Sequence, residues 1–313
     1  MSYDERMHMN MKGKKAVVTG GAGFIGSHIV DALIDGGYEV VVIDDLSAGK
    51  KENVNAKATL QVQDMCDQKA IEPLFNGADI VFHLAARPRV QYSIKHPDET
   101  NRINIGGTVS VLMSAQHAGV RRVVYSASSS AYGNQKELPL RETMTPDPLS
   151  PYGLQKYVGE LYMKLFSDVY GIETVSLRYF NVYGPRLDPD GQYALVIGKF
   201  LKQKKEGTPL TIWGDGSNTR DYTHVSDIVR GNMLAATGAK VGKGEVINLG
   251  AGRQVTVNEL AEIIGGEVVH EEPRTEPKHT LADTARANEL LGWKPSVKIE
   301  DGIEELKEIF GIA

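Results

Sequence analysis

Short apolar runs rich in β-branched residues alternate with longer amphipathic segments through the first half of the chain. Such runs are typical of buried strands, and they lie at residues 15–19, 39–44, 60–63, 79–84, 122–128 and 173–178. The amphipathic segments predict helices at residues 24–35, 101–117 and 152–170, the last opened by Ser150 as N-cap and by Pro151. Apolar strands separated by helices of this length indicate an α/β fold with a parallel sheet covered on both faces.

The pattern changes near residue 180, where Pro, Gly and polar residues become more frequent. We therefore expect a sheet domain over residues 1–180 and a smaller C-terminal α/β region over residues 181–313 that binds the substrate. A helix at 225–237 and a strand at 246–249 predict that residues 224–250 return to the main sheet. The chain has no low-complexity segment and no long linker, so we expect the two regions to pack tightly.

Composition narrows the possible functions and partners. The chain has 313 residues, and 35 Lys and Arg against 40 Asp and Glu give a formal charge of −5. This acidic balance is unfavourable for nucleic-acid binding, and no apolar run is long enough to span a membrane. Because Cys66 is the one cysteine, disulfides within the chain and cysteine-based zinc sites are excluded. We expect no metal, no nucleic acid and no membrane partner, and a cytoplasmic location because no apolar signal segment precedes the first strand.

A glycine-rich turn joins the first predicted strand to the first helix. Gly20, Gly23 and Gly26 are spaced as G-x-x-G-x-x-G, which suits a tight turn, close approach of a pyrophosphate and a helix N-terminus facing the anion. The alternative for the motif alone is a plain tight turn. Asp44 ends the second strand 24 positions after Gly20, where a carboxylate can bind ribose hydroxyls and repel a 2′-phosphate. The sequence therefore predicts a Rossmann-like, doubly wound domain that binds NAD rather than NADP. Asp64 either lies near the adenine or caps a helix.

Tyr152 and Lys156 are four residues apart on a predicted helix, so both side chains lie on one helix face. An ammonium beside a phenol favours the phenolate and lowers the pKa of the phenol, which gives a general base near neutral pH. Ser128 ends a predicted strand and faces the same crevice. Tyr132 and Lys136 repeat the spacing, but the intervening Gly-Asn pair indicates a loop in which the two side chains need not meet.

Taken together, several segments resemble the extended short-chain dehydrogenase/reductase family, and within it the NAD-dependent UDP-hexose 4-epimerases of the UDP-GlcNAc and UDP-glucose type. The resemblance runs from about residue 14 to the end of the chain. Its segments are TGGAGFIGSHIV, VVIDDLS, VFHLAA, NIGGT, SPYGLQKYVGE, LRYFNVYGPR, GDGSNTRDYTHVSDI and LLGWKP. It implies NAD as cofactor, a UDP-sugar as substrate, and a homodimer formed through the helices at 101–117 and 152–170.

The resemblance also implies a role for each matching residue. Tyr152 would be the catalytic base, Lys156 would contact the nicotinamide ribose and tune the phenol, and Ser128 would assist. Asn104 would bridge the sheet and the catalytic region near the cofactor. The NAD contacts would be Gly20, Gly23, Phe24, Ile25, Gly26, Asp44, Asp64, Met65, Leu84, Ala85, Ala86, Asn104, Tyr152, Lys156 and Tyr179. The substrate contacts would be Ser128, Ser129, Tyr152, Asn181, Thr211, Trp213, Arg220, Arg274, Glu276 and Thr280. For Thr211 and Trp213 a buried edge strand is an equally good interpretation.

Other branches of the family remain as alternatives. Nucleotide-sugar dehydratases and decarboxylases carry carboxylates just after the position of Ser128, whereas this chain has Ser129 and Ser130 there. A non-catalytic NAD(H)-binding regulator would usually lack the Tyr, Lys and Ser set, and an ordinary dehydrogenase would release NADH. Arg87 and Arg89 depart from the commonest form of the loop after the fourth strand, and the segment 274–276 is one residue shorter than usual. Thr280 stands where narrow members carry Tyr, which predicts room for an N-acetyl group.

Overall fold

The computed structural model describes residues 13–88, 90–189, 196–273 and 278–312. Its centre is a seven-stranded sheet in the order β11-β6-β5-β4-β1-β2-β3, and every pairing in it is parallel. The strands are β1 (Lys15–Thr19), β2 (Glu39–Asp44), β3 (Thr59–Val62), β4 (Ala78–His83), β5 (Arg122–Ser128), β6 (Glu173–Tyr179) and β11 (Lys243–Leu249). The predicted α/β fold with a doubly wound parallel sheet is confirmed.

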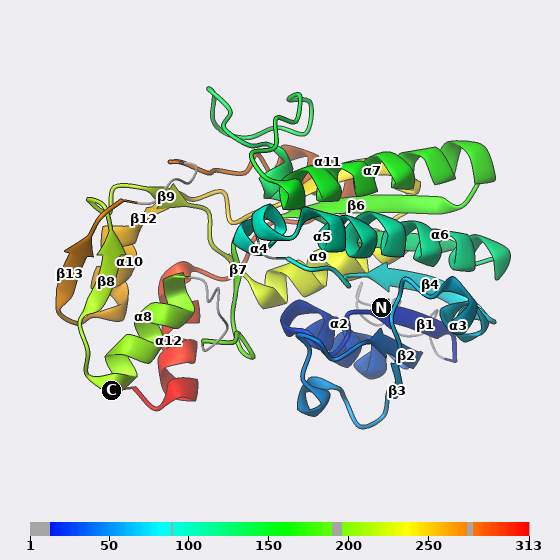
Figure 1. The fold of residues 1–313 in the computed structure, drawn as a ribbon, viewed down its shortest axis with the longest axis horizontal. Coiled ribbons are helices and arrows are strands. Elements are labelled where there is room, and N and C mark those ends of the chain that lie inside the picture. The colour runs from blue at the N-terminus through cyan, green and yellow to red at the C-terminus, as the bar shows by residue number, and fades with distance from the viewer. Residues whose placement is uncertain (1–12, 89, 190–195, 274–277, 313) are drawn as a thin grey trace.

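Helices cover both faces of this sheet (Figure 1). Alternate strand residues point to opposite faces, as the pleat requires. Val18 packs in one apolar cluster with residues of α2 (Phe24–Asp35) and α9 (Val225–Thr237). Its neighbour Val17 packs in a second cluster with residues of α3 (Gln68–Ile71), α6 (Gly107–His117) and α7 (Pro151–Tyr170). Two separate apolar clusters therefore hold the sheet between its helices.

The helix predicted at 101–117 is interrupted in the structure. α4 (Val90–Lys95) and α5 (Pro97–Asn101) come first, then a π-helical turn over Arg102–Gly106, and α6 begins only at Gly107. Consecutive glycines favour such a break because glycine is a poor helix former. A Cβ at Gly107 would lie 2.7 Å from Cε of Met65, so glycine lets that side chain pack against the helix.

The smaller region carries three two-stranded sheets beside α8, α10 and α12, on the left of Figure 1. Its core joins side chains such as Phe200, Leu260 and Ile303. The division of the chain near residue 180 stays a prediction. The strands and helices of this region are β7 (Val182–Tyr183), β8 (Leu210–Trp213), β9 (Thr219–Arg220), β10 (Thr223–His224), β12 (Val255–Thr256), β13 (Val268–Glu271), α8 (Val196–Glu206), α10 (Val257–Ile264) and α12 (Ile299–Phe310). By contrast, α11 (Ala285–Leu291) packs on the main sheet, in the same apolar cluster as Val18. Short 3₁₀ turns complete the chain at Lys51–Asn53, Glu72–Phe75 and Ser129–Ala131.

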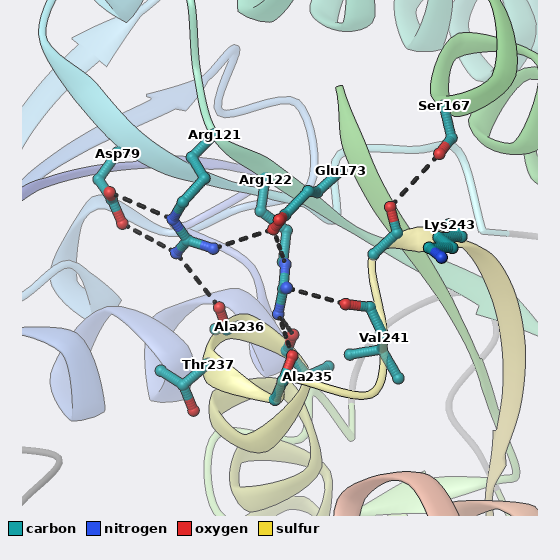
Figure 2. A network of polar contacts seen from close by, with 12 residues as sticks. Asp79, Arg121, Arg122, Ser167, Glu173, Ala235, Ala236, Thr237, Val241 and Lys243 are labelled. Carbon is teal, nitrogen blue, oxygen red and sulfur yellow. Dashed lines mark hydrogen bonds and ion pairs between the residues drawn. The ribbon is translucent and has the colours of Figure 1, made fainter. Parts of the chain in front are cut away.

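Two arginines attach the end of α9 to the main sheet (Figure 2). Arg122 is buried and donates to the carbonyl oxygens of Ala235 at 2.7 Å and Val241 at 2.9 Å, while its Nε binds Glu173 at 2.7 Å. Arg121 also binds the carboxylate of Glu173, at 3.1 Å. The last carbonyls of a helix have no partner within the helix, so guanidinium groups there satisfy them and complement the helix dipole. The network fixes the connection by which the chain returns to β11.

Within the described ranges, none of the helices combines the length and apolarity needed to cross a bilayer. The same residues contain no group of three or more His, Cys, Asp or Glu side chains arranged to hold a metal ion.

Candidate functional site

A cavity of ≈ 600 Å³ lies at the carboxyl ends of the central strands, where β1 adjoins both β2 and β4. Ligands bind at such a point in open parallel sheets because the connecting loops diverge there. The wall includes every residue predicted to contact NAD except Asn104. These residues are Gly20, Gly23, Phe24, Ile25, Gly26, Asp44, Asp64, Met65, Leu84, Ala85, Ala86, Tyr152, Lys156 and Tyr179.

The glycine turn forms one side of this cavity, and its glycines are required sterically. Gly20 has a φ of 73°, and a Cβ there would lie 2.6 Å from the backbone nitrogen of Ala85. A Cβ at Gly26 would lie 2.1 Å from the carbonyl oxygen of Gly20. Gly23 is the N-cap of α2 and makes no side-chain cap bond, so the helix begins at the cavity wall. Such a turn, facing a cavity, fits a dinucleotide phosphate better than the alternative of a plain tight turn.

Asp44 holds the loops around the cavity. Its carboxylate accepts hydrogen bonds from the backbone nitrogens of Ala22 at 3.0 Å and Leu46 at 2.9 Å. Burial raises the pKa of Asp44, and these two N–H donors oppose the shift. Asp64 also lines the cavity, accepts from the backbone nitrogen of Cys66 and pairs with Arg102 at 3.0 Å. The alternative of a helix cap does not hold for Asp64, because Asp67 is the residue that caps the next helix.

Tyr152, Lys156 and Ser128 meet in the cavity wall. Tyr152 and Lys156 lie in the first two turns of α7 and are buried, and the Lys156 Nζ donates to the carbonyl oxygen of Ser126 at 2.7 Å. The same ammonium lies 4.8 Å from the centre of the Tyr125 ring. Ser128 comes from the end of β5 and lines the same wall, and its hydroxyl donates to that of Ser130 at 3.1 Å. A base, a cation and a hydroxyl are thus gathered at one point.

The expected lowering of the Tyr152 pKa is not found in the protein chain by itself. Burial raises the pKa of Tyr152, and the hydrogen bond with Ser128 opposes the rise. Burial also lowers the pKa of Lys156 to about 7, an effect that the carboxylate of Glu160 opposes. The reason is that enclosure removes water from both groups and disfavours both charged forms. A cationic ring beside the phenol would shift the balance back toward the phenolate.

The second Tyr-x-x-x-Lys pair runs into a loop, as its Gly-Asn composition predicted. Tyr132 is fully buried, and its hydroxyl donates to the side-chain oxygen of Asn248 on β11 at 2.7 Å. Gly133 has a φ of 63° and leads the chain away from Tyr132 in a loop. Neither Tyr132 nor Lys136 lines the cavity.

Asn104 is not among the residues that line the cavity, and its contact with NAD stays a prediction. It is buried and bridges two elements of the wall: its Oδ1 accepts from the backbone nitrogen of Arg87 at 2.7 Å, and its Nδ2 donates to Gln155 at 2.8 Å. It therefore holds the loop after β4 against α7. Arg87 itself lines the cavity, whereas Arg89 lies outside the described residues.

The predicted substrate residues fall into two groups. Ser129 and Asn181 line the cavity together with Ser128 and Tyr152. The others in the described part of the chain lie in the smaller region and outside this wall: Thr211 and Trp213 on β8, Arg220 on β9, and Thr280. Arg274 and Glu276 lie outside the described residues.

The burial of β8 alternates, so it fits neither of the two interpretations, a fully buried edge strand or a substrate-binding strand, completely. Leu210 and Ile212 point into the core, as in a buried edge strand, whereas Thr211 and Trp213 alternate with them and are half-buried. Trp213 donates through its indole nitrogen to Glu271 at 2.7 Å.

A strap at Arg186, Leu187 and Asp188 also forms part of the cavity wall and was not predicted from the sequence. Arg186 has a φ of 65° and binds Asp31 of α2 at 2.7 Å. His28 of α2 contacts the carbonyl oxygen of the residue before Arg186 at 2.8 Å. The composition of this segment indicated only a loop, and its proximity to α2 comes from contacts about 155 residues apart in the sequence.

The fold and the cavity define a dinucleotide-binding protein whose site combines a tyrosine, a lysine and a serine. The chain belongs to the NAD dependent epimerase/dehydratase family, which it matches over residues 16–250. This assignment confirms the family, the Rossmann-like fold and the NAD cofactor predicted from the sequence.

Individual relatives agree with the predicted isomerase. The UDP-glucose 4-epimerase of Mycolicibacterium smegmatis is 36% identical over 310 residues, which cover 95% of this chain and 98% of that protein. The crystal structure of the Thermotoga maritima UDP-glucose 4-epimerase with UDP-glucose is 42% identical, with a TM-score of 0.91 and coverage of 95% and 98%. The UDP-N-acetylglucosamine 4-epimerase of Methanobrevibacter ruminantium, solved with UDP-N-acetylmuramic acid, is 39% identical, with a TM-score of 0.91 and coverage of 96% and 98%.

Proposed function

We propose that the protein is an NAD-dependent 4-epimerase of UDP-sugars. It interconverts UDP-GlcNAc with UDP-GalNAc, and UDP-glucose with UDP-galactose, through a 4-keto sugar. The observation that carries the proposal is that Tyr152, Lys156 and Ser128 line the same cavity as the glycine turn. The two 4-epimerases of known structure described above support it.

In this proposal each side chain has one chemical task. Tyr152 takes the proton of the sugar C4 hydroxyl and later returns one, Ser128 holds the same hydroxyl by a hydrogen bond, and Lys156 supports the phenolate. NAD held in this cavity would supply the acceptor and the donor for the C4 hydride. Asn181, Arg220, Arg274 and Glu276 hold the UDP half, which leaves the sugar free to turn. Arginine suits this purpose because guanidinium binds phosphate oxygens in pairs.

Dehydratase and decarboxylase activities are disfavoured by the wall beside Ser128. Those reactions need an additional acid or base, and the two residues that follow Ser128 in the cavity wall are Ser129 and Ser130. A hydroxyl of ordinary pKa cannot replace a carboxylate in proton transfer near neutral pH.

An activity screen with UDP-glucose, UDP-galactose, UDP-GlcNAc and UDP-GalNAc tests the function. We expect purified protein to carry NAD, to interconvert both pairs and to produce no net NADH. Net NADH would instead indicate an ordinary dehydrogenase. NAD binding without turnover of any of the four sugars would indicate the regulator.

Thr280 gives a prediction about the sugar. It is half-buried, and Tyr at this position would fill the space beside the sugar C2 substituent. We expect Thr280→Tyr to abolish turnover of the N-acetyl pair and to preserve that of the other pair. Because the Thr280 hydroxyl also accepts from the backbone nitrogen of Asp221, Thr280→Val is the matched control. It loses the hydroxyl but stays small, and should keep both activities. N-acetyl turnover by Thr280→Tyr would contradict the assignment.

We further propose that the protein is a homodimer formed through α6 and α7, which lie side by side in Figure 1. Four large apolar side chains of α7 are between 48% and 63% exposed: Leu154, Leu161, Leu165 and Val169. They follow one another at intervals of one or two helical turns and so form a stripe along the helix. Such a stripe on a soluble chain favours burial against a second copy.

Sedimentation of a charged variant tests the dimer. We expect Leu161→Glu with Leu165→Glu to convert a particle of twice the chain mass into one of single mass, because two charges would be buried in the interface. Ile309→Glu on α12 is the control, since Ile309 is 55% exposed but lies elsewhere, and should remain a dimer. A wild-type protein of single mass would rule the dimer out.

A further inference from the structure

Asp221 is a completely buried carboxylate between β9 and β10, and the cavity described above does not include it. It accepts three backbone hydrogen bonds, from Ala251 at 2.6 Å, Gly252 at 3.0 Å and Ala282 at 2.9 Å. The first two donors lie just after β11 of the main sheet, and the third follows Thr280. One side chain therefore joins the carboxyl end of the main sheet to a segment of the smaller region.

The backbone of Asp221 holds two further residues. Its nitrogen donates to the hydroxyl of Thr280 at 3.3 Å, and its carbonyl oxygen accepts from Nδ2 of Asn181 at 3.2 Å. Asn181 lines the cavity and has a φ of 27°, a conformation that a side chain-bearing residue rarely adopts without support. Arg220 is its immediate neighbour in the chain. Three residues proposed to bind substrate are thus attached to one buried residue.

The space around the carboxylate is closely fitted. A Cβ at Gly250 would lie 3.0 Å from Oδ2 of Asp221 and 2.3 Å from Cβ of Ala282. Burial raises the pKa of Asp221 to about 6, and the three N–H donors oppose the rise. The three donors favour the ionised carboxylate, the form to which they bind most strongly.

We propose that Asp221 is a positioning residue for the substrate: it fixes Asn181 and Arg220 relative to the cavity so that they can hold the diphosphate of the UDP-sugar, and it fixes Thr280 beside the sugar. This inference rests on the proposed function. Asp221 does not itself contact the reacting atoms, so its effect falls on binding of the UDP half rather than on proton transfer.

The test replaces Asp221 with Asn, which keeps the shape but turns one acceptor into a donor that faces backbone N–H groups. The change removes a hydrogen bond to a charged group and leaves a backbone donor unpaired. We therefore expect the affinity for UDP to fall and KM to rise, each about 10- to 100-fold. We expect kcat to change less than threefold and NAD content to stay at the wild-type level. UDP affinity is measured by calorimetry and bound NAD after denaturation of the protein.

Asp227 provides the matched control. It is also buried, and its carboxylate accepts from the backbone nitrogens of Ser296 at 2.9 Å and Val297 at 3.0 Å, but these join α9 to the segment before α12. Asp227→Asn should lower the melting temperature as Asp221→Asn does, yet leave UDP affinity unchanged. A general loss of stability would weaken UDP binding in both variants equally, and that outcome would overturn the proposal.

A second variant covers the case in which Asp221→Asn fails to fold. Gly250→Ala removes no polar group but crowds Ala282 and the carboxylate, and we expect the same rise in KM with kcat retained. If a folded Gly250→Ala or Asp221→Asn protein bound UDP with wild-type affinity, the positioning role of Asp221 would be contradicted, but the proposed function would not. Wild-type protein that binds UDP without epimerising any sugar contradicts the proposed function, while the comparison of UDP affinities still decides the role of Asp221. Wild-type protein that binds no UDP contradicts both.

Discussion

Replacing Tyr152 with Phe is expected to lower kcat for epimerisation by about 10²- to 10⁴-fold, the range that a positioned general base contributes. The change removes one oxygen and leaves the ring, so the buried packing at the start of α7 is kept. NAD content should remain at the wild-type level because the glycine turn and Asp44 are untouched. The measurement is a coupled assay of kcat together with the NAD released on denaturation.

Tyr132→Phe is the control for this variant, since Tyr132 belongs to the other Tyr-x-x-x-Lys pair and its hydroxyl binds Asn248. We expect it to lose some stability but to keep kcat within a few-fold of wild type. If Tyr152→Phe retained more than a tenth of the wild-type kcat with both substrate pairs, the base would have to be another residue of the cavity.

The parts of this protein that could be predicted from the sequence are those encoded over short distances. The strand at 39–44 is marked by its own β-branched residues, and Asp44 by its place at the strand's end. The faces of Tyr152 and Lys156 follow from a spacing of four on a helix that Ser150 and Pro151 begin. The glycine turn is equally local, because the close approach of Gly26 to Gly20 lies within seven residues.

Features that depend on distant contacts could not be predicted. Arg186 of the strap forms an ion pair with Asp31, which lies 155 residues earlier in the chain, and no local sequence pattern indicates such a pair. A bridging role for Asn104 is implied by the family resemblance, but its partners Arg87 and Gln155 are distant in the sequence and no local pattern identifies them. The roles of Arg220 and Thr280 stay predictions, since their distance from the main cavity depends on how the smaller region sits on the sheet.

The pKa of Tyr152 shows the same division between local and distant effects. The spacing of four residues predicted a lowered pKa because it places the Lys156 ammonium near the phenol. The same spacing does not reveal how deeply the fold buries the two side chains. The fold buries both groups, and in the chain by itself desolvation raises the pKa of Tyr152 and lowers that of Lys156. We infer that the base becomes effective only in the loaded site, where a cationic ring adjoins the phenol. Proton abstraction is thereby coupled to the presence of the oxidant.

Lys156→Met tests this electrostatic account, because it removes the cation and keeps a side chain of similar length. An opposite charge nearby lowers a pKa by about 1–3 units, so its loss should raise the pKa of Tyr152 by that amount. In the proposed mechanism the phenolate is the active form, so kcat is expected to rise with pH as Tyr152 loses its proton. The limb of the kcat profile should therefore move about 1–3 pH units higher, with activity about 10- to 1000-fold lower at pH 7 and partly restored in more alkaline buffer.

The control is Lys164→Met on the same helix, where Lys164 is half-exposed and paired with Asp168, and its profile should match that of wild type. Folding of Lys156→Met should be preserved, since replacing a buried cation by an apolar side chain removes a desolvation cost. A Lys156→Met profile that is lower at every pH but unmoved along the pH axis would contradict the account. It would mean that Lys156 positions the cofactor ribose without influencing the ionisation of Tyr152.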